Sequence, residues 1–121
     1  IFTGKCAPSE TQKYYRLGDI FASASITETQ GLTFMEAMAA RLLVLARYDD
    51  NLVGTIKDGE TGYFFFGEDD FASKLDKAIN IKAEERKRIE DNALEVIDIY
   101  SLERFYQNIM EVYERVHKKH W

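Results

Sequence analysis

The fold is decided by residues 20–46, which read IFASASITETQGLTFMEAMAARLLVLA. Residues 20–24 and 42–46 are short apolar runs of strand length. Residues 32–40 between them are apolar at nearly every position, which predicts a helix that is buried on all sides. A strand, a helix and a second strand in succession form the repeating unit of a parallel sheet.

The residues before this unit predict one more strand and one more helix. Residues 1–3 read as the end of a strand. Ser9 is the expected N-cap of the helix, because Gln12 stands three positions later, as in a capping box. We expect this helix to run to about Leu17 and to end at Gly18 in a left-handed cap.

A third complete strand is predicted downstream. Asp50 or Asn51 is expected to cap a short helix, and the Asp58-Gly59 pair is expected to form a turn. The aromatic run at residues 63–66 then reads as a strand.

Only helices are predicted after residue 67. Residues 71–79 and the charged stretch 82–97 have helical spacing, and Ser101 is expected to cap a long amphipathic helix. Its apolar residues recur with a 3.6-residue period: Leu102, Phe105, Tyr106, Ile109, Tyr113 and Val116. The pattern predicts an α/β fold: a partial Rossmann-like parallel sheet with flanking helices and a helical C-terminal tail, in a single domain of residues 1–121.

Composition excludes several classes of protein. Of the 121 residues, 45% are hydrophobic and 13% aromatic, which excludes intrinsic disorder. The single cysteine, Cys6, cannot form an internal disulfide, and no apolar run approaches the roughly 20 residues of a membrane span. A net charge of −5 without a Lys/Arg block argues against nucleic-acid binding. We therefore expect a cytoplasmic globular domain. Because the chain opens at Ile1, we interpret it as a piece of a longer protein.

The polar loop of residues 25–31 is the first place to look for a ligand site, because open α/β sheets bind ligands beyond the carboxyl ends of their strands. Neither common glycine-rich phosphate fingerprint is present. Gly31 would let the backbone approach a ligand. Leu32, Thr33 and Phe34 would form the first turn of a helix. Their free amides, together with the helix dipole, would attract a phosphate.

Glu36 is the most informative residue of the predicted helix, because a carboxylate among apolar neighbours needs a partner. It has two interpretations. Glu36 either contacts a ligand, or it reaches back to Thr33 in a capping box. Glu28 alone would read as a solvated loop acid. The pair of glutamates, which flanks a helix start opened by Gly31, favours a site.

Five short motifs together resemble the C-terminal, nucleotide-sugar-binding half of family-4 retaining GT-B glycosyltransferases. They lie within residues 1–66 in the family's order and spacing, whereas the later helices match in layout only. Residues 28–34, with Asp50-Asn51-Leu52, are similar to bacterial members that glucosylate diacylglycerol from UDP-glucose. The motifs are Phe2-Thr3-Gly4, residues 19–25, the pair Glu28 and Glu36, Glu36-Ala37-Met38-Ala39, and Asp58-Gly59-Glu60-Thr61-Gly62-Tyr63.

The resemblance implies a role for each site residue. Glu36 would accept hydrogen bonds from the ribose hydroxyls of the nucleotide, and the amides of Leu32 and Thr33 would hold the diphosphate. Glu28 would be the catalytic residue, contacting the donor sugar and placing its anomeric carbon. The remaining donor-binding residues would be Gly31, which permits close approach, and Gly4 and Lys5, whose loop would lie near the base.

The family also implies a reaction and its participants. A hexose from the nucleotide sugar, with UDP-glucose as the first choice, would pass with retention to a lipid or saccharide acceptor. The leaving phosphate would serve as base, with no metal and no other cofactor. The N-terminal acceptor-binding half and a basic Arg/Lys pair would lie upstream, so the chain alone should not catalyse. The parent would be peripheral to the inner face of the membrane.

Two departures from the family motivate an alternative function. Arg41 and Leu43 stand where the family usually has Gly and Pro. The alternative is a non-catalytic α/β module that keeps the fold as a protein-interaction surface. In addition, a sheet without its upstream strands would have an open edge, which invites dimerisation. His117 and His120, near the end of the last predicted helix, suit the helix dipole better than a metal.

Overall fold

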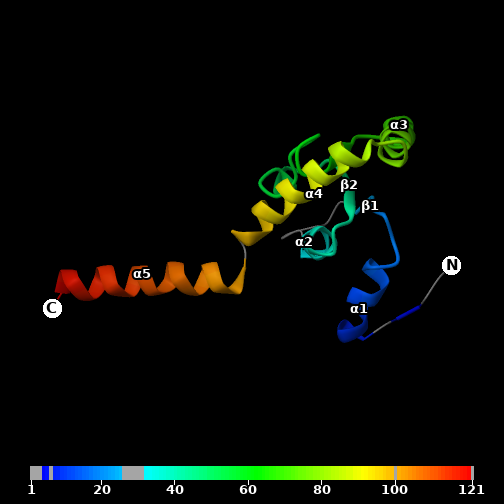
Figure 1. The fold of residues 1–121 in the computed structure, drawn as a ribbon. Coiled ribbons are helices and arrows are strands. Elements are labelled where there is room, and N and C mark those ends of the chain that lie inside the picture. Colours follow the sequence, from blue (N-terminus) through cyan, green and yellow to red (C-terminus); the bar gives the residue numbers. More distant parts are fainter. Residues whose placement is uncertain (1–3, 6, 26–31, 100, 121) are drawn as a thin grey trace.

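A three-stranded parallel sheet forms the centre of the protein, which we describe from a computed structural model over residues 4–5, 7–25, 32–99 and 101–120 (Figure 1). The helices and strands follow in the predicted alternation. They are α1 (Pro8–Tyr15), β1 (Ile20–Ser23), α2 (Leu32–Ala39), β2 (Leu43–Arg47), the 3-10 helix η1 (Asp50–Leu52), β3 (Tyr63–Phe65), α3 (Glu68–Ile79), α4 (Ala83–Asp98) and α5 (Leu102–His120).

The sheet has the order β1-β2-β3, and both neighbouring pairs are parallel. Ile20 pairs with Leu43, and Leu45 pairs with Tyr63. The α/β prediction is therefore confirmed. Within the described part of the chain β1 is an outer strand and is only partly buried, whereas four of the five β2 residues are buried.

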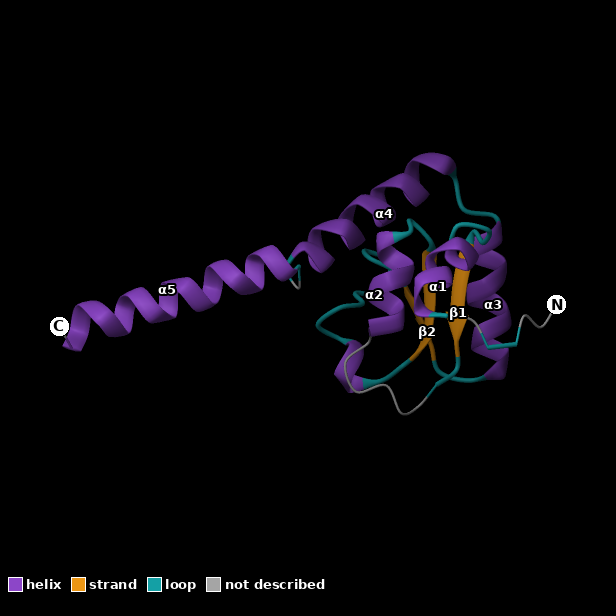
Figure 2. Ribbon diagram, turned by 90° about the horizontal axis from the view of Figure 1, so that it is seen from below, coloured by secondary structure: helices purple, strands orange, loops and turns teal. Residues whose placement is uncertain are grey.

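The central strand β2 supplies both layers of the core, because successive side chains of a strand point to opposite faces. Val44 and Ala46 face α2, and Leu43 and Leu45 face α3, so the two helices cover opposite sides of the sheet (Figure 2). The first layer contains Phe34, Ala37, Met38, Leu42, Leu52, Ile56, Phe64 and Ala93, and the second contains Tyr63, Phe65, Ala78 and Ile89.

Helix α4 lies at the amino ends of the strands. Arg86 donates to the carbonyl of Asp19, which precedes β1. Arg88 Nη2 and Asn92 Nδ2 donate to the carbonyls of Gly59 and Glu60, at 3.2 and 3.0 Å, in the turn that precedes β3. These contacts place α4 at the end of the sheet opposite to the carboxyl ends of the strands, where open α/β sheets usually bind their ligands.

Helix α5 projects away from the layered body in both views (Figures 1 and 2). Tyr106, Val112, Tyr113 and Val116 on this helix are more than half exposed. Across the described residues, no helix has the length and apolar character that a membrane crossing requires.

Several predicted helix ends differ from the structure. Ala7, not Ser9, is the N-cap of α1, because Pro8 takes the first helical position, which needs no N–H donor. The helix ends at Tyr15 with a right-handed C-cap at Arg16, so Gly18 does not form the expected left-handed cap. Asp49 caps η1, because its side chain accepts from the Asn51 amide. The predicted strand at residues 1–3 lies outside the described residues.

Candidate functional site

Helix α2 carries the central candidate residues. It follows β1 and precedes the parallel strand β2, so it begins on the side where the strands end. Leu32 and Thr33 are its first two residues, and the amides of a first helical turn have no partner within the helix. The first turn of α2 carries no acidic side chain, so no carboxylate of that turn repels an anion at its amides.

Glu36 is held by an aromatic residue from another helix. The Tyr15 hydroxyl on α1 donates to Glu36 Oε2 over 3.1 Å. Thr33 lies inside α2 and is not its N-cap, so the predicted capping box is wrong. The Glu36 side chain is exposed, unlike those of Ala37 and Met38, which pack into the core, so the prediction that this helix is buried on all sides is wrong.

A cavity of about 320 Å³ lies beside Glu36, between α1 and α2. Its lining combines hydroxyl, amide, guanidinium and carboxylate groups with two alanines, and such convergent polar groups suit a ligand with several hydroxyls. The lining residues are Thr11, Gln12, Tyr15, Arg16, Glu36, Ala39 and Ala40.

A second cavity, of about 610 Å³, lies at the carboxyl ends of the strands. Its wall includes Ala24 after β1, Arg47 at the end of β2, and Phe66 after β3. Tyr48 stacks on Phe66 with ring centroids 5.0 Å apart, and its hydroxyl donates to Asp50 over 2.9 Å. That hydrogen bond and the negative charge of Asp50 raise the pKa of Tyr48 above its ordinary value.

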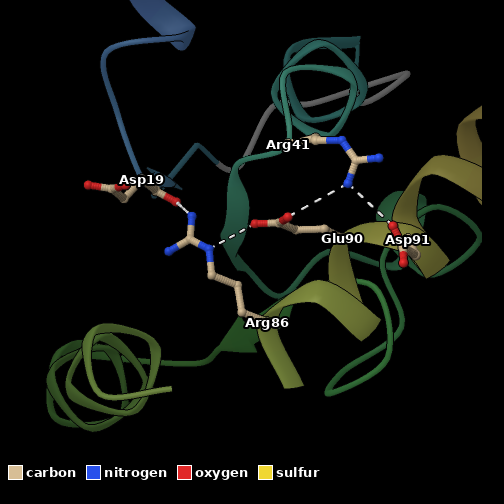
Figure 3. Close-up of polar contacts among 5 residues, drawn as sticks. All are labelled: Asp19, Arg41, Arg86, Glu90 and Asp91. Atoms are coloured by element: carbon tan, nitrogen blue, oxygen red, sulfur yellow. Dashed lines mark hydrogen bonds and ion pairs between the residues drawn. The ribbon is translucent and has the colours of Figure 1, made fainter. Parts of the chain in front are cut away.

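The C-terminal end of α2 is fixed by an unusual residue, Arg41. Its φ is 62°, and the Arg41 and Leu42 amides donate to the carbonyls of Met38 and Ala37, each over 3.0 Å. These bonds form a Schellman motif, in which glycine is the usual residue at the left-handed position. The Arg41 guanidinium reaches α4, where Nη1 lies 3.3 Å from Asp91 Oδ1 (Figure 3).

The predicted site residues fall into three groups. Leu32, Thr33 and Glu36 come together on α2. Gly4 has the left-handed φ of 70° that suits a turn and Lys5 is exposed, but neither lines the described cavity beside Glu36. Glu28 and Gly31 lie outside the described residues. Their predicted roles therefore stay predictions.

Sequence reasoning missed Tyr15 as a partner of Glu36. Twenty-one positions separate the two residues, and no local pattern links them. Only the packing of α1 against the β1–α2 unit shows the contact. Among the described residues, no group of three or more histidine, cysteine or carboxylate side chains is placed to hold a metal ion.

Comparison with known proteins identifies the family. Residues 1–96 match the family described as glycosyl transferases group 1. An alpha-monoglucosyldiacylglycerol synthase from Streptococcus pneumoniae (strain ATCC BAA-255 / R6) is 44% identical over 79 residues, which are 65% of this chain and 18% of that protein. A protein of the same name from Acholeplasma laidlawii is 43% identical over 67 residues, 55% of this chain and 17% of that protein. The chain thus spans less than a fifth of the length of these relatives.

A solved structure agrees in fold. The C-terminal domain of a glycosyl transferase group 1 family protein (LpcC) from Francisella tularensis has a TM-score of 0.71 and 29% identity. The match covers 84% of this chain and 53% of that one. Motifs, topology and relatives lead to one conclusion: the chain belongs to the glycosyl transferases group 1 family.

Proposed function

We propose that this chain binds the nucleotide-sugar donor of a retaining glycosyltransferase and that the donor is UDP-glucose. The observation that carries the proposal is the position of Glu36, whose carboxylate borders a polar cavity one helical turn after the Leu32 amide. A carboxylate is a strong acceptor for two neighbouring ribose hydroxyls, and helix amides suit a diphosphate. In this arrangement Glu28 contacts the donor sugar, and Gly4 and Lys5 lie near the base.

The acceptor and the reaction course are part of the same proposal. The matched relatives are named for a glucosylated diacylglycerol, which favours a lipid acceptor held by a separate N-terminal half. The chain spans 18% of the synthase from Streptococcus pneumoniae, so we expect it to bind donor without turning it over. Positioning and stabilisation of the leaving diphosphate would drive the transfer, without a metal.

Saturation-transfer NMR of the chain with UDP, UDP-glucose, GDP-mannose and ATP tests the donor. We expect transfer to the uridine nucleotides, unchanged by EDTA. In Glu36→Gln the dissociation constant for UDP should rise about 10- to 100-fold, because a charge-assisted acceptor is lost. Glu95→Gln, an exposed change on α4, is the matched control and should leave binding unchanged.

Three outcomes would contradict the proposed donor site. Transfer to none of the four nucleotides at millimolar ligand would favour the alternative, an α/β module that serves protein interaction. Loss of transfer to UDP in Glu95→Gln would show that the signal does not report on the α2 site. An effect of EDTA on UDP binding would contradict a site without a metal.

A further inference from the structure

We propose that Tyr15 is a positioning residue for Glu36 and that it thereby makes the site selective for a nucleotide with an intact ribose diol. This role rests on the proposed function, because it concerns the same carboxylate. The observation that supports this role is the 3.1 Å hydrogen bond from the Tyr15 hydroxyl to Glu36 Oε2.

The position of the Tyr15 hydroxyl is fixed by a row of three packed aromatic rings. The Tyr15 ring packs on Phe21 of β1, with centroids 5.6 Å apart and planes at 55°. Phe21 in turn meets Phe34 of α2 edge to face at 5.4 Å. Phe34 is buried in the core, so the three rings form a continuous contact on one face of the sheet, from α1 by way of β1 to the helix that carries Glu36.

Glu36 needs such a support because its side chain is exposed. A free glutamate side chain loses rotamer entropy when it orders around a ligand, and a hydroxyl that already holds one carboxylate oxygen removes part of that cost. An ionised carboxylate has about four acceptor positions on its two oxygens. Tyr15 occupies one of them, which leaves the acceptors that a pair of ribose hydroxyls requires.

Selectivity follows from this geometry. A 2′-hydroxyl donates to Glu36 at full strength only when the carboxylate is held in one orientation. The orientation of the carboxylate affects the binding of a 2′-deoxynucleotide less, because that ligand lacks one of the two hydroxyl donors. Removal of the Tyr15 hydroxyl should therefore weaken binding of the ribonucleotide more than binding of the deoxynucleotide.

The test compares Tyr15→Phe with Tyr14→Phe, in titrations of the full chain with UDP and with 2′-deoxy-UDP. Tyr14 is the neighbouring residue on α1, is 42% exposed and does not line the cavity. Phenylalanine at position 15 keeps the ring contacts. We expect Tyr15→Phe to raise the dissociation constant for UDP about two- to tenfold, and that for 2′-deoxy-UDP by a smaller factor. Tyr14→Phe should change neither, and Tyr15→Phe should have no effect on UDP binding when Glu36 is already alanine.

Each of the following results would overturn the role. Equal weakening of both nucleotides would mean that Tyr15 only supports packing. Tighter UDP binding in Tyr15→Phe would mean that Tyr15 competes with the ribose. In the free protein, the Glu36 carboxyl carbon resonance should move in Tyr15→Phe and not in Tyr14→Phe, and an unmoved resonance would contradict the contact itself.

Failure of the unmodified chain to bind either nucleotide would refute the proposed function and the Tyr15 role together, whereas binding with an unchanged UDP preference would refute the Tyr15 role alone.

Discussion

Arg41 and Asp91 join the end of α2 to α4 through a 3.3 Å ion pair, although the Arg41 backbone is left-handed, with a φ of 62° (Figure 3). Glu90 Oε2 lies 3.9 Å from the same guanidinium nitrogen. The residue that departs from the family pattern thus keeps the left-handed turn that glycine normally makes, and it adds an ionic contact that glycine cannot make.

Replacements of Arg41 should separate backbone strain from ionic contact. Glycine and alanine both remove the ion pairs, but only alanine keeps a side chain in the left-handed conformation. We expect Arg41→Gly to be more stable than Arg41→Ala by about 1 kcal/mol in urea unfolding. Arg88, inside α4, is the control, where alanine should instead be the more stable of the two by about 1 kcal/mol. An alanine variant at position 41 as stable as the glycine variant would contradict a strained Arg41.

Arg86 and Glu90 should behave as a coupled pair. Arg86 Nε lies 2.8 Å from Glu90 Oε1, and the Glu90 side chain is only 14% exposed. Arg86→Met removes this bond and the contact with the Asp19 carbonyl, and we expect a loss of about 1–2 kcal/mol of unfolding free energy. The double variant Arg86→Met/Glu90→Leu should be less destabilised than the sum of the single variants, because neither charge of this pair is left behind without the other. Additive losses in denaturant unfolding would show that the pair is not coupled.

Tyr63→Phe should stabilise the protein. The Tyr63 side chain is 1% exposed, and among the described residues its buried hydroxyl has no hydrogen-bond partner. The ring lies under Lys77, whose Nζ is 5.1 Å from the centroid, and phenylalanine keeps this contact. Removal of an unsatisfied hydroxyl should raise the unfolding free energy by about 1 kcal/mol. A lower melting temperature for Tyr63→Phe would indicate a partner for the hydroxyl, such as bound water.

The same residue predicts a loss of stability at alkaline pH. Burial raises the pKa of Tyr63 above its ordinary value of 10.0. A raised pKa contributes stability that is complete below the unfolded pKa and is lost as the pH rises through the folded one. The unfolding free energy should therefore fall above about pH 10, and less steeply in Tyr63→Phe. Tyr106→Phe, a change at an exposed position on α5, is the control and should follow the unmodified chain in unfolding series between pH 8 and 11.

Gly62 and Gly18 should respond differently to alanine. A Cβ at Gly62 would meet the Val44 carbonyl oxygen at 3.0 Å, so the pairing of β2 with β3 would have to shift. We expect Gly62→Ala to cost about 1–3 kcal/mol. At Gly18 a Cβ would meet only ordinary contacts, the nearest being Leu42 Cδ2 at 3.8 Å, so Gly18→Ala should change stability by less than about 0.5 kcal/mol. Thermal unfolding that ranks the two variants in the opposite order would contradict the packing at Gly62.

Local sequence patterns are sufficient to predict a helix or strand where one periodicity extends over the whole element. The apolar run that became β2 and the spacing that became α3 both predicted their elements, because burial of an apolar face selects one regular conformation. Helix ends were less predictable. Ser9 and Gly18 are residue types that commonly cap helices. In the structure, however, α1 begins at Pro8 and ends at Tyr15, so both of its ends lie before the predicted capping residues.

The sequence by itself determined the family, the alternation of strands and helices, and the placement of Leu32, Thr33 and Glu36 on one helix, because these features depend on residues that are near one another in the chain. Only the tertiary structure decided that Tyr15 contacts Glu36, that Arg41 contacts α4, and that α4 lies at the amino ends of the strands. Those contacts join residues 21, 50 and 67 positions apart. Such distant pairs meet only because hydrophobic burial on both faces of the sheet brings their helices together.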